Sequence, residues 1–211
     1  MAEAPPDGRR VRGDANRARV LRLAADMASE EGLEGLTLSR LAQDLGISRS
    51  NVHALFGGSK QELQLATVAA ARTRFIEAVV QPVIGRPPGL ERLRALLDSW
   101  CDYIEEDVFV GGCFVLHGLF EFGRRPGPVR EALISAQQEW TALLRRHLQV
   151  AIDAGELLVP DPEQLLFELD AALVGANATR LAGDPRGPEF GRRAVITALD
   201  RHRASARPSP G

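Results

Sequence analysis

Several residue types are scarce in this 211-residue sequence, which has only two cysteines, one tyrosine and one lysine. The cysteines, Cys101 and Cys113, are too few for a disulfide framework or a four-thiolate zinc site. The four histidines are scattered without metal-ligand spacing, so we expect no metal and no cofactor. No apolar run approaches the roughly 20 residues that a membrane span needs. The first residues also lack the basic start and apolar stretch of a signal peptide, which predicts a cytoplasmic chain with no membrane partner.

Charge is distributed unevenly along the chain. The 26 basic and 28 acidic residues leave a formal net charge of −2. Between Arg9 and Arg22, however, arginine is the dominant residue and Asp14 is the only acid. A basic segment on a mildly acidic body favours a protein that meets a polyanion with one end. A solvated, disordered tail is the alternative interpretation.

Hydrophobic periodicity predicts an all-α fold. No stretch alternates apolar and polar residues with the period of a strand, and glycine or proline separates windows of helical spacing. We expect about nine helices, over residues 14–31, 37–45, 48–56, 60–80, 90–107, 112–122, 128–154, 162–182 and 188–203.

Residues 37–56 contain two short helices joined by a glycine-containing turn, the pattern of a helix-turn-helix. At about 100° per residue, Val52 and Phe56 fall on one face of the second helix and can pack inward. Ser50 and Ala54 fall on the opposite face, which is small and polar. A major-groove reader needs such a face for close approach to the base edges. A plain helical hairpin with a solvated face is the alternative.

Several motifs in this region occur in order at a recognisable spacing. They are Gly32-Leu33-Glu34-Gly35-Leu36-Thr37, Leu41-Ala42-Gln43-Asp44-Leu45-Gly46-Ile47-Ser48 and Ser59-Lys60-Gln61-Glu62-Leu63. With them, residues 16–70 resemble the DNA-binding domain of TetR-type (tetracycline-repressor-like) transcriptional regulators. The family usually has tyrosine at the position of His53 and often histidine at Ala54. The segment from Phe56 to Lys60 is also one residue longer than is usual in the family.

The resemblance implies how the domains are organised. The expected parts are a disordered basic arm (1–13), a helix-turn-helix DNA-binding domain (14–62) that runs into a connector helix (60–80), a larger helical effector-binding and dimerisation domain (81–203), and a disordered tail (204–211).

The resemblance also implies the DNA contacts. Thr37 would cap the second helix and touch a phosphate, and Lys60 would meet phosphate at the start of the fourth. The residues expected to bind double-stranded operator DNA are Arg12, Arg17, Thr37, Ser48, Arg49, Ser50, Asn51, His53 and Lys60.

A homodimer through the last two helices is implied as well. Small residues around Gly175 permit close helix approach, and the final helix carries an apolar stripe. The expected interface residues are Leu166, Leu173, Phe190, Ala194, Val195 and Ala198. Burial of these residues within a monomer core is the alternative.

The larger domain is expected to bind a small apolar or amphipathic effector with few polar contacts. The candidate residues are Trp100, Tyr103, Cys113, His117, Phe120, Trp140, Phe167 and Asn177, and ordinary core packing is the alternative for each. Asp170 would either pair with a cationic ligand or point to solvent.

The sequence therefore predicts a ligand-responsive transcriptional regulator, a repressor that binds a palindromic operator and is released by its effector. A constitutive dimeric regulator without an effector is one alternative, and an all-helical enzyme is another. The sequence contains no nucleophile elbow, phosphate loop or zinc pattern, so we expect no enzymatic activity and no catalytic residue.

Overall fold

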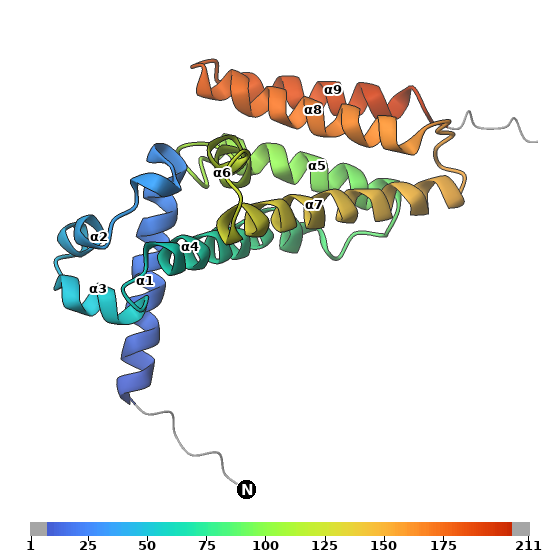
Figure 1. Cartoon of the computed structure of the whole chain (residues 1–211). Coiled ribbons are helices and arrows are strands. Elements are labelled where there is room, and N and C mark those ends of the chain that lie inside the picture. Colours follow the sequence, from blue (N-terminus) through green and yellow to red (C-terminus); the bar gives the residue numbers. More distant parts are fainter. Residues whose placement is uncertain (1–7, 204–211) are drawn as a thin grey trace, which may run out of the picture. The chain divides into compact units, whose positions relative to one another are not determined.

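The computed structural model describes residues 8–203, with side chains described from residue 13 onward. The described residues form an all-helical chain, as the sequence predicts, with one isolated bridge between Leu157 and Arg203 and no strand. The nine α-helices of this part (Figure 1) are α1 (Gly8–Glu31), α2 (Leu38–Leu45), α3 (Arg49–Leu55), α4 (Lys60–Phe75), α5 (Leu90–Glu105), α6 (Phe114–Phe122), α7 (Pro128–Asp153), α8 (Pro162–Leu181) and α9 (Gly187–Asp200).

Two helix boundaries differ from the prediction. Helix α1 begins at Gly8, so residues 8–13 are helical and not a disordered arm. Arginine is a good helix former, and one glycine lowers helix stability by only about 1 kcal/mol. The expected connector helix ends at Phe75 and continues as a π-helical turn, η2 (Ile76–Val80). The rest of the expected arm and the expected tail (204–211) lie outside the described residues.

The chain divides into two compact units. The first comprises residues up to Thr73 together with Phe109–Leu133, and the second comprises Arg74–Val108 and the residues from Ile134 onward. This division falls within α4 and within α7, and it differs from the expected boundaries because α6 belongs to the first unit. A sequence-based boundary at a proline- and glycine-rich segment cannot anticipate a later helix that packs against the first ones.

The first unit has a core shared by its helices. Val20 and Ala24 on α1, Leu41 on α2, Val52 on α3 and Leu63 on α4 are 0% exposed. The fifth helix of this unit, α6, is preceded by a loop that lies directly on the end of α1. There the Gly111 N–H donates to Ser29 Oγ at 3.3 Å, and a Cβ on Gly111 would lie 1.6 Å from the Ser29 carbonyl oxygen.

The second unit is built on α8 and α9, which lie side by side and pack with α5 (Figure 1). Leu93, Leu169 and Leu199, one from each of these helices, are fully buried. Gly191 allows the close approach of α9 to α8, because a Cβ there would lie 2.7 Å from the Ala176 Cβ. Among the described residues, none of the helices has both the length and the apolar character needed to cross a membrane.

We expect Gly111→Ala to lower the free energy of unfolding by about 1–3 kcal/mol, because the added methyl group overpacks a site bounded by rigid backbone. Gly13→Ala is the matched control, since nothing lies within 4 Å of its Cβ position. This variant should gain about 0.5–1 kcal/mol from the better helix propensity of alanine. Denaturant unfolding measures both values. A Gly111→Ala variant as stable as the parent would contradict the close approach of the loop to α1.

Candidate nucleic-acid interface

Local capping sets the geometry of the helix-turn-helix. Thr37 Oγ1 accepts the Arg40 N–H at 3.2 Å at the start of α2, and Ser48 Oγ accepts the Asn51 N–H at 3.2 Å at the start of α3. Gly46 ends α2 in the left-handed region, with φ at 64°. These are preferred residues for an N-cap and a left-handed C-cap, so the sequence alone favours this turn.

Helix α3 presents a polar outer face. Val52 and Phe56 are buried against the unit, as the helical spacing predicts. The exposed residues are Arg49, Ser50, Asn51, His53 and Ala54. Arg49 makes no ion pair with any described residue, so its guanidinium is available to an external partner.

Two arginines of α1 bind the ends of the next helices. Arg17 Nη1 donates to the Leu55 carbonyl oxygen at 2.5 Å, and Arg19 Nη2 donates to the Leu45 carbonyl oxygen at 3.5 Å. The last carbonyls of a helix lack partners within the helix, so these contacts satisfy the C-terminal ends of α3 and α2. Arg17 was predicted as a DNA contact. In the structure the half-buried Arg17 binds the C-terminal end of α3, and its DNA contact stays a prediction.

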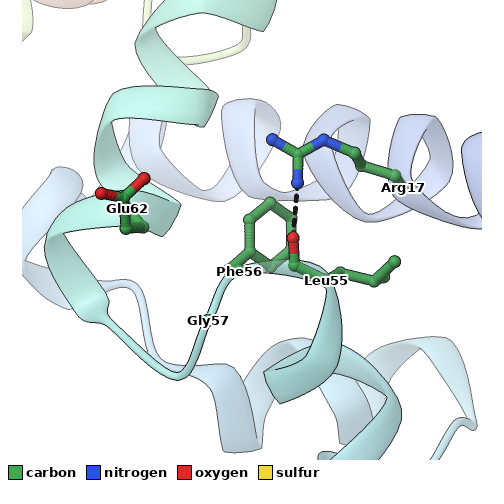
Figure 2. Close-up of a pocket in the computed structure, with 5 residues that line it drawn as sticks. All are labelled: Arg17, Leu55, Phe56, Gly57 and Glu62. Atoms are coloured by element: carbon green, nitrogen blue, oxygen red, sulfur yellow. Dashed lines mark hydrogen bonds between the residues drawn. The ribbon is translucent and has the colours of Figure 1, made fainter.

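A pocket of about 380 Å³ surrounds this arginine (Figure 2). It is lined by Arg17, Leu55, Phe56, Gly57 and Glu62. The Arg17 guanidinium carbon lies 4.8 Å from the centroid of the Phe56 ring, so the cation lies over the aromatic face that closes α3. The pocket is therefore lined by one basic side chain, Arg17, and one acidic side chain, Glu62.

The extra residue between α3 and α4 is accommodated by two successive left-handed glycines. Gly57 has φ at 56° and Gly58 has φ at 74°. A Cβ on Gly58 would lie 2.1 Å from His53 Nε2, so the absence of a side chain also makes room for the imidazole ring. Residues with a Cβ rarely adopt this conformation, and the longer link therefore requires this glycine pair.

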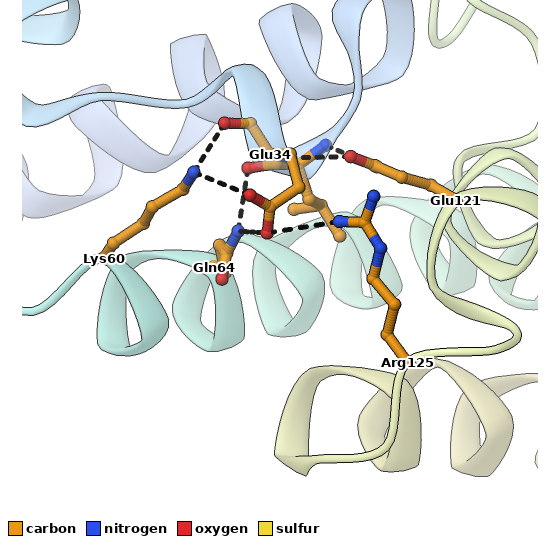
Figure 3. Close-up of polar contacts among 6 residues, drawn as sticks. Glu34, Lys60, Gln64, Glu121 and Arg125 are labelled. Atoms are coloured by element: carbon orange, nitrogen blue, oxygen red, sulfur yellow. Dashed lines mark hydrogen bonds and ion pairs between the residues drawn. The ribbon is translucent and has the colours of Figure 1, made fainter.

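Lys60, the first residue of α4, is bound to Glu34 (Figure 3). Its Nζ donates to the Glu34 carbonyl oxygen at 2.6 Å and to the carboxylate at 3.0 Å. The buried Gln64 side chain donates to the Leu33 carbonyl oxygen at 3.0 Å and to Glu34 Oε1 at 3.2 Å. Hydrogen bonds from Lys60 and Gln64 hold the pKa of Glu34 below its ordinary value. Lys60 was predicted to meet phosphate, and here its charge is neutralised within the chain.

Glu121 on α6 completes this polar cluster (Figure 3). Its two carboxylate oxygens accept the N–H groups of Leu33 and Glu34, each at 2.8 Å, at the start of the 3-10 turn η1 (Leu33–Gly35). Arg125 lies 3.8 Å from the Glu34 carboxylate. Sequence reasoning did not assign a role to Glu34, Gln64 or Glu121. Glu121 lies 88 positions after Leu33 and 87 after Glu34, and no local sequence signal indicates contacts over such a separation.

The residues expected to bind the effector do not all lie in the same unit. Trp100, Tyr103, Trp140 and Asn177 are buried in the second unit. Phe75, which the sequence reasoning missed, meets Tyr103 and Trp140 edge to face, each at 5.4 Å between centroids. The other four expected residues are placed differently. Cys113, His117 and Phe120 belong to the first unit, and Phe120 and Phe167 are 80% and 68% exposed.

Four of the six expected dimer residues are buried within the single chain. They are Leu166, Leu173, Val195 and Ala198, which pack in the core of the second unit. Phe190 and Ala194 are exposed. The neighbouring exposed residues of α8 are Phe167, Ala171, Gly175 and Ala178. The exposed residues of α8 are thus one or two positions away from the expected Leu166 and Leu173. The sequence did not distinguish the two sides, because both sides of this helix carry apolar residues.

Asp170 is a half-buried carboxylate on the side of α8 that faces α7. It accepts a hydrogen bond from Gln137 Nε2 at 3.5 Å, and burial raises its pKa. The same two helices are joined by Arg145 and Glu163, with a shortest distance of 2.7 Å. Asp170 forms no ion pair with a described residue. The described residues contain no group of three or more side chains suited to holding a metal ion.

An all-helical chain with a capped helix-turn-helix, in which the outer face of α3 is polar and exposed, is typical of transcriptional regulators. A family model described as the tetracyclin repressor-like C-terminal domain matches residues 89–195, half of the chain. The chain belongs to the TetR family of transcriptional regulators.

Solved structures share the fold. A TetR transcriptional regulator from Chloroflexus aurantiacus has a TM-score of 0.79 and 24% identity, over 92% of this chain and 98% of that one. A protein from Saccharomonospora viridis in complex with choline has a TM-score of 0.75 and 18% identity, over 89% and 96%. AibR in complex with isovaleryl coenzyme A and operator DNA has a TM-score of 0.67 and 18% identity, over 87% and 98%. No curated protein matches this sequence.

We expect Asp170→Asn to raise the free energy of unfolding at neutral pH by up to about 1 kcal/mol, since a half-exposed charge is partly screened. Burial raises the pKa of Asp170 above 3.8, so its ionisation disfavours the folded state as pH rises through that range. The gain should disappear as pH falls toward 3.8.

Asp184→Asn is the control of opposite sign. Hydrogen bonds from Arg186 lower the pKa of the partly exposed Asp184 to about 2, so its ionised form favours the folded state at neutral pH. This variant should lose stability at neutral pH, and its difference from the parent should shrink as pH falls from about 4 toward 2. Denaturation across pH 2–7 measures both variants. An Asp170→Asn variant that is less stable at pH 7 would contradict the assignment of a desolvated, uncompensated carboxylate.

Proposed function

We propose that this TetR-family regulator is a repressor that binds a palindromic operator as a homodimer and is released by a small-molecule effector. The observation that carries the DNA-binding part is the outer face of α3. Its exposed arginine, serine and asparagine follow an N-cap that the turn holds in place. This arrangement supports direct reading of base edges in the major groove.

Specific roles follow from the chemistry of these side chains. Arg49 is suited to the O6 and N7 acceptors of guanine, and Asn51 to the N6 and N7 groups of adenine. Ser50 and His53 flank them, and Thr37 and Ser48 lie at the helix starts where hydroxyl groups reach phosphate. Arg12 is proposed as a further phosphate contact from outside the described side chains.

The proposed dimer uses the exposed face of α8 and α9. Phe167, Ala171, Gly175 and Ala178 recur every three or four residues along α8, so they form one stripe. Phe190 and Ala194, exposed on α9, are proposed to extend this surface. Small residues in the middle of the stripe let a second copy approach closely, and a two-fold axis would bring each stripe against itself. Two recognition helices held in this way would read half-sites about 34–36 Å apart.

The proposed effector is an amphipathic cation that binds in the second unit. The Phe75, Tyr103 and Trp140 rings pack edge to face in this unit, and Asp170 is a carboxylate without a cationic partner among the described residues. Quaternary ammonium groups are recognised by such side chains, and a relative of the same fold was solved with choline. The alternative is a constitutive regulator, which the close packing of the three rings favours. A choline-induced rise in melting temperature, lost in Asp170→Asn, separates the two.

We expect the Arg49→Ala, Asn51→Ala double variant to lose about 2–6 kcal/mol of operator affinity, since each bidentate base contact contributes about 1–3 kcal/mol. Binding to DNA that flanks the gene, measured by gel shift at two salt concentrations, tests this. The control is Arg146→Ala, Gln138→Ala, which removes the same groups from the exposed surface of α7. Absence of salt-dependent, sequence-specific binding by the parent protein would refute the proposed function.

We expect Ala171→Arg to weaken dimerisation about thirty-fold or more, equivalent to about 2 kcal/mol, because the new charge faces its own copy across the two-fold axis. Ala171 is exposed, so the substitution leaves the core of the second unit unchanged. Ile84→Arg is the control, because Ile84 is 64% exposed and lies outside α8 and α9. Sedimentation equilibrium measures the dissociation constant. A dimer unaffected by Ala171→Arg would place the interface elsewhere.

A further inference from the structure

Two cations next to the recognition helix are neutralised within the chain. Arg40 lies in the first turn of α2, and its guanidinium makes two hydrogen bonds with Glu31, one of them 2.7 Å from Nη2 to Oε1. Lys60 lies at the first position of α4 and binds Glu34 at 3.0 Å. Glu31 and Glu34 come from one short segment, 31–34, at the junction of α1 and α2. Arg40 Nε also lies 3.9 Å from the Asp44 carboxylate, one turn along α2.

The position of these pairs matters for DNA. In a helix-turn-helix, the helix before the recognition helix crosses the phosphate backbone, and phosphate is attracted to helix N-termini. Arg40 and Lys60 lie in the first turns of the helices before and after α3. Their side chains are about half exposed, at 45% each, so both ion pairs are open to solvent.

Carboxylate oxygens present the same acceptors to these cations as phosphate oxygens do. An arginine forms two parallel hydrogen bonds with either group, as Arg40 does with Glu31. Hydrogen bonds from Arg40 hold the pKa of Glu31 below its ordinary value, and those from Lys60 and Gln64 do the same for Glu34. Both carboxylates therefore stay charged at neutral pH.

Glu34 is also held in place from several sides. Gln64 and Arg125 bind its carboxylate, and Glu121 binds its backbone N–H (Figure 3). A side chain with this many partners does not swing away readily when a phosphate approaches Lys60. Arg49, by contrast, is exposed on the reading face without an ion pair among the described residues. The positive charge of Arg49 is thus available on the outer face of α3. The charges of Arg40 and Lys60, which flank α3 where DNA phosphates would lie, are paired with carboxylates.

We propose that Glu31 and Glu34 are specificity-determining residues that act as internal substitutes for phosphate. By occupying Arg40 and Lys60 they lower the electrostatic affinity for DNA of any sequence and leave the base contacts of α3 intact. Non-specific binding depends almost wholly on phosphate neutralisation, whereas operator binding also includes base contacts. The two carboxylates therefore raise the ratio of operator to non-specific affinity. This inference rests on the proposed DNA-binding function.

The test compares the full-length protein with a Glu31→Gln, Glu34→Gln variant on a random-sequence duplex over a series of salt concentrations. Each additional phosphate contact steepens the slope of log K against log salt by about 0.9. The variant should therefore show a slope steeper by about 1 to 2, since Asp44 stays close to Arg40. Its affinity at low salt should be at least several-fold higher. Operator affinity should rise less than random-sequence affinity.

The matched control is Glu91→Gln, Glu163→Gln, which makes the same change in net charge. It breaks two exposed ion pairs of the second unit, with Arg86 and Arg145. Its salt slope should equal that of the parent. Equal slopes for the test and control variants would overturn the inference.

Lys60→Gln tests the same inference by removing the cation in place of the carboxylate. In the parent background, this test does not depend on the stability of the Glu31→Gln, Glu34→Gln variant. In the parent it should leave the salt slope unchanged, and in the Glu34→Gln background it should remove about 0.9 from the slope. A shallower slope in the parent would mean that Lys60 already contacts phosphate, and it would overturn the inference. If the parent protein binds DNA and the salt slopes of the glutamine variants equal that of the parent, only this inference is refuted. If the parent binds no DNA, the proposed function is refuted as well.

Discussion

The carboxylate of Glu121, which accepts the N–H groups of Leu33 and Glu34, is the contact on which the geometry of the first unit depends. The first N–H groups of a helical turn have no partner within the turn. Glu121 satisfies two of them at 2.8 Å each. Gly32 makes this possible, because its φ of 85° turns the chain and a Cβ there would lie 2.8 Å from the carboxylate. With the backbone of Glu34 held in this way, its side chain is placed to bind Lys60.

Internal partners also occupy several of the cations around the helix-turn-helix. Arginine and lysine near a DNA-reading helix suggest phosphate contacts, yet several of them have internal partners. Arg17 and Arg19 bind carbonyl groups at the ends of α3 and α2, and Arg40 and Lys60 bind carboxylates. The reading face is left with Arg49 as an arginine without an ion pair in the described part of the chain. In the proposed function, these internal pairs and the net charge of −2 limit the attraction to DNA of any sequence.

In the second unit, the helix α8 has two apolar faces, one buried in the core and one exposed. The inner face of α8 packs with α5 and α9 through residues such as Leu169 and Leu173, which are 0% and 1% exposed. Its outer face carries Phe167, at 68% exposed, with small residues after it. One helix thus contributes both to the core of the chain and to the proposed contact with a second copy. Asp170 lies on a third side, toward α7, where it is partly desolvated.

The sequence by itself determined the helices, the turn and the family, because the signals for these act over a few residues. Thr37, Gly46 and Ser48 predicted the helix-turn-helix through capping, and helical spacing predicted which residues of α3 are buried. Only the tertiary structure decided which apolar side of α8 faces outward, since Leu166 and Phe167 are equally apolar neighbours. It also decided that Arg17 and Lys60 have internal partners and that Glu121 caps the 3-10 turn before α2. The physical reason is that a long-range hydrogen bond depends on where packing brings two distant segments, and nothing in the sequence near either segment reports the other.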